Sequence, residues 1–428
     1  MSCRILARRL PRDDTPTCEH PRVHARQFRL HGFCASILCG SSAVTPAAAQ
    51  DTERPRRVWF VDVMRLLASL QMVNGHTVDA VILPALKFGP IFDYYNWGRG
   101  LVSVGFLMVS GIAFSVSTLA RFERHRADPQ AIRRRFRRAA VVVAAGYFLG
   151  LPWGASSPDP AQASLAWTYF FSVGILHCIG VALLVLEALT LAARSAGQVV
   201  WAAGVLAALA FAVAPLADAT LEPRQAQLLL NWISHQGGSP FPLLPWAGNV
   251  FAGVVVGSLA LPLGGQTPHR LVWSRLGVLA GGTWLLAAVL RAVPWTAVTA
   301  ATHPSARPAF VVANLSAVLG ATLGLSVLVA PIRTLPRVLR ILAAETLAIY
   351  VFHLVVLFGF DLRLARRIGP ILSLPQALAV SAFMITLTGT FAVAWHGIKA
   401  VWQRPDTGAG PPAFGKSRVI PWPGPAPP

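Results

Sequence analysis

The chain has 428 residues, of which 54% are hydrophobic and only 13% are charged, and its mean hydropathy is +0.56. A soluble domain carries about 25% charged residues, so this composition excludes an ordinary soluble protein and predicts a chain that exposes apolar surface to a bilayer. The net charge of +20 would suit a nucleic-acid partner in a soluble protein, but here the arginines cluster at the ends of apolar runs, as in cytoplasmic loops of membrane proteins. We therefore expect no nucleic-acid partner.

Residues 1–57 are rich in arginine and lack hydrophobic periodicity, which predicts a disordered, basic cytoplasmic extension. The segment "FRLHGFCASILCGSSAVTPAAAQ" has the order of a signal peptide, with basic residues, an apolar middle and an alanine-rich end. Its apolar middle is weak and comes late in the chain, so the extension is the favoured interpretation.

From Val58 onward, apolar runs approach the roughly 20 residues that a spanning helix needs. We predict an all-α, polytopic integral membrane protein in which about ten such helices form one bundle, a single domain over residues 58–398. Residues 399–428, rich in proline and glycine, are expected to form a disordered tail. The predicted helices cover residues 58–83, 100–119, 138–153, 168–191, 199–217, 243–263, 271–291, 310–330, 339–360 and 374–398.

Orientation follows the positive charges, which favour the cytoplasmic side. The segment 120–138 holds eight arginines and is predicted to be cytoplasmic, whereas 152–167 has no lysine or arginine and is predicted to be external. Alternation then puts both termini in the cytoplasm of a cell whose inner (plasma) membrane holds the protein. One loop disagrees, because Arg363, Arg366 and Arg367 would be external.

The first predicted helix carries a polar seam. At 100° per residue, its charged and hydroxyl side chains share a stripe about 100° wide, and lipid would not tolerate such a stripe, so it must face protein or water. Asn74 lies on the opposite side and is expected to contact another helix. The seam consists of Asp62, Arg65, Ser69, His76 and Asp79.

Arg65 and His76 lie about 16 Å apart along the helix axis, so they could hold opposite ends of an extended ligand. Imidazole is the side chain best suited to exchange protons near neutral pH, and His76 is therefore the main catalytic candidate. Asp62 and Arg65, three residues apart, could equally form an ion pair that only stabilises the helix.

His177 and His353 also lie in apolar runs, where each could line the same cavity or bond to a neighbouring helix. Tyr350 lies one turn before His353 on the same helical face. Trp246 follows a proline at the start of the sixth predicted helix, which favours an interfacial position, with substrate contact as the second interpretation. No zinc motif or phosphate-binding loop is found, so we expect no metal and no permanently bound cofactor.

Six segments, taken together in chain order, resemble the catalytic domain of the heparan-alpha-glucosaminide N-acetyltransferase family, in its bacterial relatives, within the wider transmembrane acyltransferases. Two positions depart from its pattern, Leu66 in place of a glycine and Ala344-Glu345 in place of Gly-Arg. The spacing of Arg65 and His76 is also similar to that of the acyltransferase-3 family, the alternative assignment. The segments are "RVWFVDVMRLLASLQMVNGH", "VGFLMVSGIAFSVS", "IRRRFRRAAVVVAAGYFLGLP", "FSVGILHCIGVALLVLEAL", "FPLLPWAGNVFAGVVVGSL" and "LAAETLAIYVFHLVVLFG".

The resemblance implies an enzyme that moves an acetyl or other acyl group from cytosolic acyl-CoA to a hydroxyl or amine of a glycan beyond the membrane. His76 would then act as a general base or as a transient acyl carrier. The arginine run 133–138 would attract the coenzyme phosphates, or would be an ordinary cytoplasmic flank. The alternative function is a transporter or lipid flippase, because buried charges on several helices also mark substrate pathways.

Overall fold

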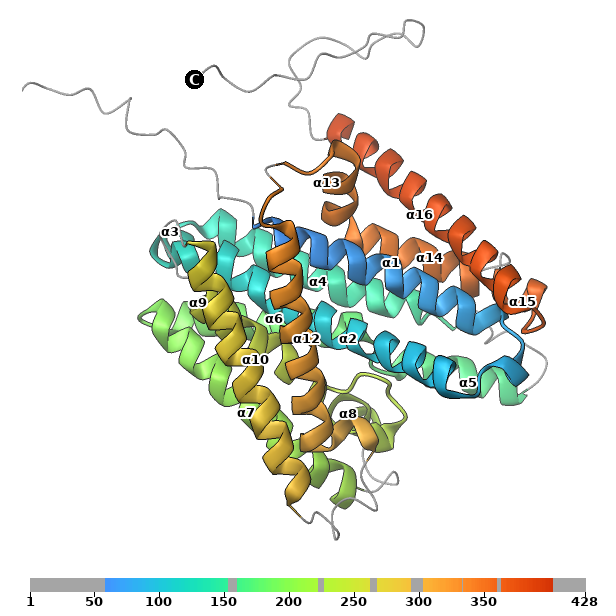
Figure 1. Cartoon of the computed structure of the whole chain (residues 1–428), viewed down its shortest axis with the longest axis horizontal. Helices are drawn as coiled ribbons and strands as arrows, with labels where there is room; N and C mark the ends of the chain where they lie inside the picture. The colour runs from blue at the N-terminus through green and yellow to red at the C-terminus, as the bar shows by residue number, and fades with distance from the viewer. Residues whose placement is uncertain are drawn as a thin grey trace, which may run out of the picture. The chain divides into compact units, whose positions relative to one another are not determined.

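The computed structural model describes residues 58–152, 160–221, 227–261, 268–293, 303–332, 334–359 and 363–402. These residues form helices, and one isolated bridge joins Ile82 to Leu372 (Figure 1). The predicted extension 1–57 lies outside the described residues, and the first helix follows it in the sequence. The last helix ends at residue 402, four residues beyond its predicted end. The predicted tail 399–428 is therefore helical over its first four residues, and from residue 403 onward it lies outside the described residues. The α-helices are α1 (Trp59–Val81), α2 (Pro90–Ser117), α3 (Phe122–Ala127), α4 (Pro129–Leu149), α5 (Pro160–Phe171), α6 (Ile175–Ala192), α7 (Ala196–Thr220), α8 (Gln227–Ile233), α9 (Leu243–Ala260), α10 (His269–Ala292), α12 (Pro308–Val329), α13 (Arg337–Ala344), α14 (Thr346–Phe358), α15 (Leu364–Ile368) and α16 (Leu374–Trp402).

Within the described residues, seven helical segments are long and apolar enough to cross a membrane, or eight if the bent pair α13–α14 forms one span. This confirms the prediction of an all-α, polytopic membrane protein. All ten predicted segments are helical, but α1 and α4 are not among the seven. Both helices carry several charged residues: α1 carries the polar seam, and α4 has five arginines in its first half. The count of ten spans stays a prediction.

Two helices begin earlier than hydropathy predicts. Helix α2 starts at Pro90 instead of residue 100, and α4 starts at Pro129 instead of residue 138. Proline fits the first helical position because its fixed φ suits a helix and it lacks an N–H that would go unpaired. At α4 the carboxylate of Asp128 caps the helix by accepting the backbone N–H of Gln130 at 2.9 Å. Backbone hydrogen bonds from Ala131 and Gln130 hold the pKa of Asp128 below its usual value. Because α4 starts at Pro129, the arginine run 133–138 lies within this helix.

The single helix predicted over 339–360 is wrong, because the segment is two helices that meet at 73°. Glu345 lies at the break with non-helical φ and ψ of −100° and 25°. Its carboxylate accepts hydrogen bonds from Lys399 Nζ at 2.6 Å and from His396 Nδ1 at 2.8 Å, both on α16. The glutamate that departs from the family pattern thus has two hydrogen-bond partners on the last helix. The predicted segment 168–191 is likewise divided, between α5 and α6.

Small residues bring α2 and α9 close together. A Cβ atom on Gly111 would lie 1.9 Å from the carbonyl oxygen of Val250, and one on Gly253 would lie 2.1 Å from that of Met108. One turn further along, the hydroxyls of two serines, Ser115 and Ser258, hydrogen-bond at 2.9 Å. Small residues allow this contact because helices in lipid associate through close backbone packing rather than through a hydrophobic driving force.

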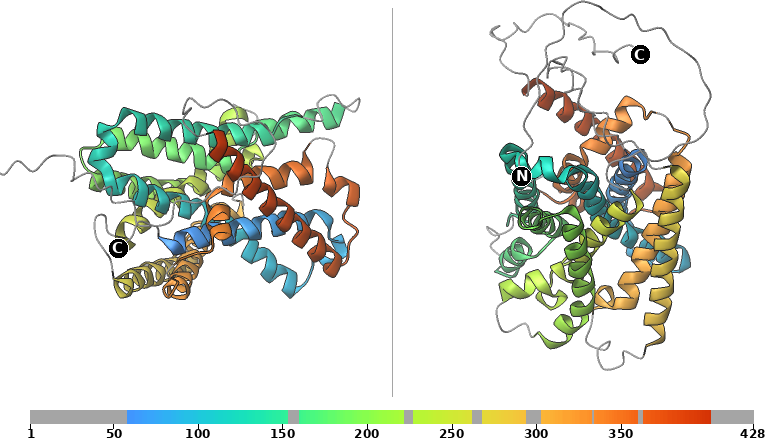
Figure 2. Two further views of the ribbon diagram at one scale, coloured as in Figure 1. Left: turned by 90° about the horizontal axis from the view of Figure 1, so that it is seen from above. Right: turned by 90° about the vertical axis from the view of Figure 1, so that its left-hand side faces the viewer.

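Helix α1 is packed among α2, α12, α13, α14 and α16. In both views of Figure 2, α16 (red) lies across α1 (blue), in agreement with their contacts. We call the end of the bundle where α1 begins the Arg65 end and the end where it finishes the His76 end. Backbone hydrogen bonds of Leu372 with Val81 and Leu83 place the α15–α16 turn at the His76 end.

Candidate active site

The polar seam of α1 meets α14 at a pair of histidines. His76 Nδ1 lies 3.0 Å from His353 Nε2, and the two rings stack with an interplanar angle of 12°. His353 is fully buried, and Tyr350 packs edge-on against its ring at 5.6 Å. The structure thus brings together three of the residues singled out from the sequence, and it turns His76 toward protein rather than toward lipid.

The hydrogen bonds determine which nitrogen of each ring carries a proton. His353 Nδ1 lies 2.9 Å from the carbonyl oxygen of Ile349, and a carbonyl only accepts, so this nitrogen must donate. In the neutral ring, His353 Nε2 is then an acceptor, and His76 Nδ1 donates to it. When His76 is also neutral, its Nε2 keeps a lone pair, which is the atom a general base needs.

At the His76 end the seam finishes in a charge cluster. The Asp79 carboxylate accepts from Lys87 Nζ at 2.9 Å and lies 3.6 Å from Arg99 Nη1 of α2. Arg99 and Asp79 both lie near enough to His76 to interact with it electrostatically. Sequence reasoning missed Arg99 because hydropathy placed the second helix after it. The proline that begins α2 was the signal that could have placed this arginine inside the helix.

At the Arg65 end, Arg65 interacts electrostatically with Asp62 on its own helix, and Arg135 of α4 interacts with both Arg65 and Glu187. The Asp62–Arg65 ion pair considered from the sequence stays a prediction, and Arg135 adds a second arginine at this end. Between the two ends, the buried hydroxyl of Ser69 has no hydrogen-bond partner among the described residues. The seam thus runs from a cationic end to a histidine and includes a buried hydroxyl that has no hydrogen-bond partner among the described residues.

Asn74, on the other side of α1, contacts two helices as predicted. Its side-chain Nδ2 donates to Tyr95 Oη on α2 at 3.1 Å, and its Oδ1 accepts from Ser381 Oγ on α16 at 2.8 Å. These bonds confirm an interhelical role for Asn74. They also help to fix the rotation of α1, which turns His76 toward α14.

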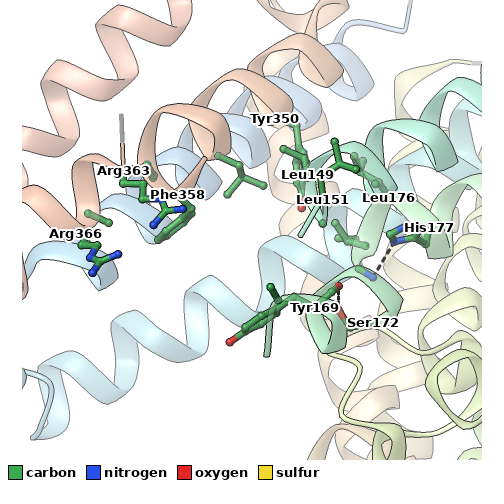
Figure 3. Close-up of a pocket in the computed structure, with 18 residues that line it drawn as sticks. Leu149, Leu151, Tyr169, Ser172, Leu176, His177, Tyr350, Phe358, Arg363 and Arg366 are labelled. Carbon is green, nitrogen blue, oxygen red and sulfur yellow. Dashed lines mark hydrogen bonds between the residues drawn. The ribbon is translucent and has the colours of Figure 1, made fainter. Parts of the chain in front are cut away.

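A cavity of about 810 Å³ lies between α4, α5 and α6 on one side and α14 and α15 on the other (Figure 3). Tyr350 lines it and separates it from the buried His353, and neither His76 nor any other residue of α1 is part of the lining. Tyr350 therefore lies between the cavity and the histidine pair. The prediction that Arg65 and His76 hold opposite ends of one extended ligand stays a prediction.

His177 lines the same cavity, on the side opposite Tyr350. Its ring is 3% exposed, and its Nδ1 accepts the backbone N–H of Gly174 at 3.1 Å. In the neutral ring the proton is then on Nε2, and this N–H has no hydrogen-bond partner among the described residues. Gly146 of α4 makes room for the ring, since a Cβ there would lie 2.8 Å from Nε2.

Trp246 lies elsewhere, in a second polar cluster at the start of α9. Its Nε1 donates to His235 Nε2 at 3.2 Å, and His235 Nδ1 lies 3.1 Å from Asp218 Oδ2. His303 stacks on His235, and burial together with this neighbour lowers the pKa of His303. The cluster ties α7, α9 and the turn before α12 together, and the structure does not bring Trp246 to His76. No group of three metal-ligating side chains is arranged for an ion in the described part of the chain.

The sequence was compared with known protein families. The model of the family described as heparan-alpha-glucosaminide N-acetyltransferase, catalytic, matches residues 57–287, more than half of the chain. The match includes Arg65, His76 and His177 and ends before Tyr350 and His353. No curated protein matches the chain. The family match confirms the resemblance seen in the sequence, and together with the apolar helices it shows that the chain belongs to the heparan-alpha-glucosaminide N-acetyltransferase catalytic family and is a membrane acetyltransferase.

Proposed function

We propose that the protein transfers an acetyl or other acyl group from cytosolic acyl-CoA to a hydroxyl or amine of a sugar on the opposite side of the membrane. The His76 end faces away from the cytosol, and the Arg65 end and both termini face the cytosol of the cell whose inner membrane holds the protein. His76 is the catalytic base, and His353 orients it.

The observation that carries the proposal is the hydrogen-bonded chain from the Ile349 carbonyl through His353 to His76. It leaves His76 Nε2 with a lone pair inside the bundle. In the proposed step this nitrogen removes the proton from the acceptor hydroxyl or amine. The acceptor atom then bonds to the acetyl carbon as the carbon–sulfur bond breaks. The leaving coenzyme A thiolate takes up the proton from His76, so that the histidine is regenerated.

The Arg65 end suits the donor. Coenzyme A carries several phosphates far from its thioester, and arginines hydrogen-bond phosphate through charge-assisted bonds. Arg65 and Arg135 lie close enough to interact electrostatically, and two like charges in proximity favour a bound anion. Asp62 partly offsets Arg65 and keeps its side chain in place. The distance of about 16 Å along α1 from Arg65 to His76 matches an extended donor rather than a compact one.

The acyl donor and the catalytic histidine are tested together with purified protein and acetyl-CoA labelled in its acetyl group. We expect His76→Ala to lower acetyl transfer to glucosamine by about 10²–10⁴-fold, because general-base catalysis contributes that much. His269→Ala is the matched control, since His269 is an exposed histidine at the start of α10, and it should keep wild-type rates.

The same experiment without acceptor separates direct transfer from an acylated histidine. Label that stays on the wild-type chain and disappears in His76→Ala would show an acyl-histidine intermediate, whereas an unlabelled chain supports direct transfer. Wild-type transfer rates in His76→Ala, with the thioester still consumed, would remove the histidine from the mechanism.

A further inference from the structure

The arginines after α14 lie at the end of the bundle where positive charge is least expected. The backbone pairing of Leu372 with α1 puts α15, with Arg366 and Arg367, at the His76 end. With the Arg65 end in the cytosol, these cations are external, against the usual bias of arginine toward the cytosol. Lys87 and Arg99 are at the same end, and both pair with Asp79. The external position of Arg366 therefore needs another explanation.

The cavity described above supplies one, because Arg363 and Arg366 both line it (Figure 3). In Figure 3 their side chains lie at one end of the cavity and His177 lies at the other. Arg366 is exposed, and its guanidinium has no hydrogen bond or ion pair with any residue that the structure describes. An arginine at the mouth of a cavity can bind an anionic group through charge-assisted hydrogen bonds.

The backbone supports the same interpretation. Arg363 has φ of 32° and ψ of 50°, and it is the only non-glycine residue with positive φ among those described. A side chain other than glycine, asparagine or aspartate rarely takes this conformation, and such strained positions persist where the surrounding structure requires them. Here the strained residue contributes to the cavity lining.

Most of the rest of the lining is apolar. Leucines from three segments form its walls, including Leu149, Leu354 and Leu357. Tyr169 of α5 also lines the cavity and is 71% exposed, and Trp167 beside it is 48% exposed. Exposed tyrosine and tryptophan mark the membrane–water interface. A ligand held here needs an apolar part in the membrane and an anionic group near its surface.

We propose that this cavity binds the lipid phosphate of a membrane-anchored acceptor, so that the sugar acetylated by the protein is lipid-linked through a phosphate. The phosphate lies between Arg363 and Arg366, the lipid chain lies along the leucine walls, and the attached sugar reaches toward Tyr350. The unpartnered Nε2–H of His177 donates to an oxygen of the ligand at the other end of the cavity. This assignment rests on the proposed function, and it names the class of acceptor for the same site.

Binding is measured with radiolabelled farnesyl phosphate, a minimal lipid phosphate, on protein in nanodiscs of phosphatidylcholine and without any acyl donor. We expect saturable binding that is competed by unlabelled farnesyl phosphate, and much more weakly by farnesol or by inorganic phosphate. In Arg366→Gln the Kd should rise about tenfold, because one charge-assisted contact is lost, and Arg366→Lys should recover part of this loss.

Two further variants separate charge from shape. Leu354→Trp fills the cavity but keeps both arginines, and it should weaken binding of farnesyl phosphate as strongly as Arg366→Gln. Arg291→Gln is the control, since Arg291 is an exposed arginine in the last turn of α10, and its Kd should equal that of the wild type. Thermal unfolding of each variant in detergent shows that the fold is kept.

Equal binding by the wild type, Arg366→Gln and Leu354→Trp would overturn the proposal, and so would competition by phosphatidylglycerol as effective as that by farnesyl phosphate. These results would not affect acetyl transfer, which the donor assay with His76→Ala measures separately. Conversely, a protein that binds farnesyl phosphate as expected but never consumes acetyl-CoA would contradict the proposed function and leave the lipid site standing.

Discussion

The reactivity assigned to His76 depends on one neighbouring side chain. His353 is fully buried and joined to the backbone of α14, so its Nε2 is held as an acceptor at 3.0 Å from His76 Nδ1. Without this acceptor the His76 ring can rotate or take the other tautomer, and its lone pair would no longer face the substrate. The base is thus set by a contact between helices 277 positions apart in the chain.

We therefore expect His353→Ala to lower kcat about 100-fold, the usual cost of misplacing a catalytic group, while KM for acetyl-CoA changes little. His353→Gln, whose amide oxygen can accept from His76 Nδ1, should recover part of the rate. Steady-state kinetics on the two purified variants measures this difference. Equal rates in His353→Ala and the wild type would show that His353 does not position the base.

At this scale the sequence predicted the seam and its direction correctly but not its partners. The 100° periodicity showed that Arg65, His76 and Asp79 share one face, because that depends only on the local helix geometry. Which helix meets that face is a long-range contact that periodicity does not contain, so the bond to His353 was only one of several alternatives. Trp246, for which substrate contact was the second interpretation, bonds to His235 in a separate cluster.

Among the helices, the contact of α2 with α9 depends most on residue size. Gly111→Ala would place a Cβ 1.9 Å from the carbonyl oxygen of Val250, so the helices must separate. We expect a loss of about 1–3 kcal/mol in the free energy of unfolding, the typical cost of overpacking. Gly281→Ala on α10 is the control, because nothing lies within 4 Å of its Cβ. Reversible unfolding in mixed detergent measures both, and equal stability of the two variants would contradict this packing.

The break between α13 and α14 gives a second prediction. Glu345→Ala removes a carboxylate, 6% exposed, that accepts from Lys399 and His396. The two donors are 38% and 43% exposed and can be hydrated instead, so the cost should be about 1–2 kcal/mol rather than that of a fully buried pair. Thermal unfolding of Glu345→Ala measures this loss of stability. Glu123→Ala is the control, because Glu123 is an exposed glutamate on α3. Equal melting temperatures of the two variants would show that the Glu345 contacts do not stabilise the fold.

Hydropathy located all ten helical segments and misplaced several of their ends. Hydropathy predicts the start of a helix where the chain becomes apolar. Helices α2 and α4 begin earlier, at Pro90 and after the cap formed by Asp128. Those start signals are local and could have been used. The bend at Glu345 was not predictable in this way, since no proline or glycine marks it and its cause is a contact with α16.

On the scale of the whole molecule, the bundle has two ends with different chemistry. The Arg65 end holds cations suited to the proposed coenzyme phosphates, and the His76 end holds the proposed base, the cavity and the α15 arginines. Composition and charge were enough to predict a membrane protein and an orientation. The preference of positive charge for the cytosolic side does not account for the α15 arginines, because it describes how membrane proteins insert and says nothing about ligand binding.

The sidedness of transfer tests this division most directly. Protein is reconstituted into sealed liposomes that enclose glucosamine, and labelled acetyl-CoA, which does not cross the bilayer, is supplied only outside. Molecules whose Arg65 end faces outward should place labelled acetyl groups on the enclosed glucosamine, and His76→Ala should not. Labelled sugar that forms only when glucosamine and acetyl-CoA share one compartment would contradict transfer along α1 from one side of the membrane to the other.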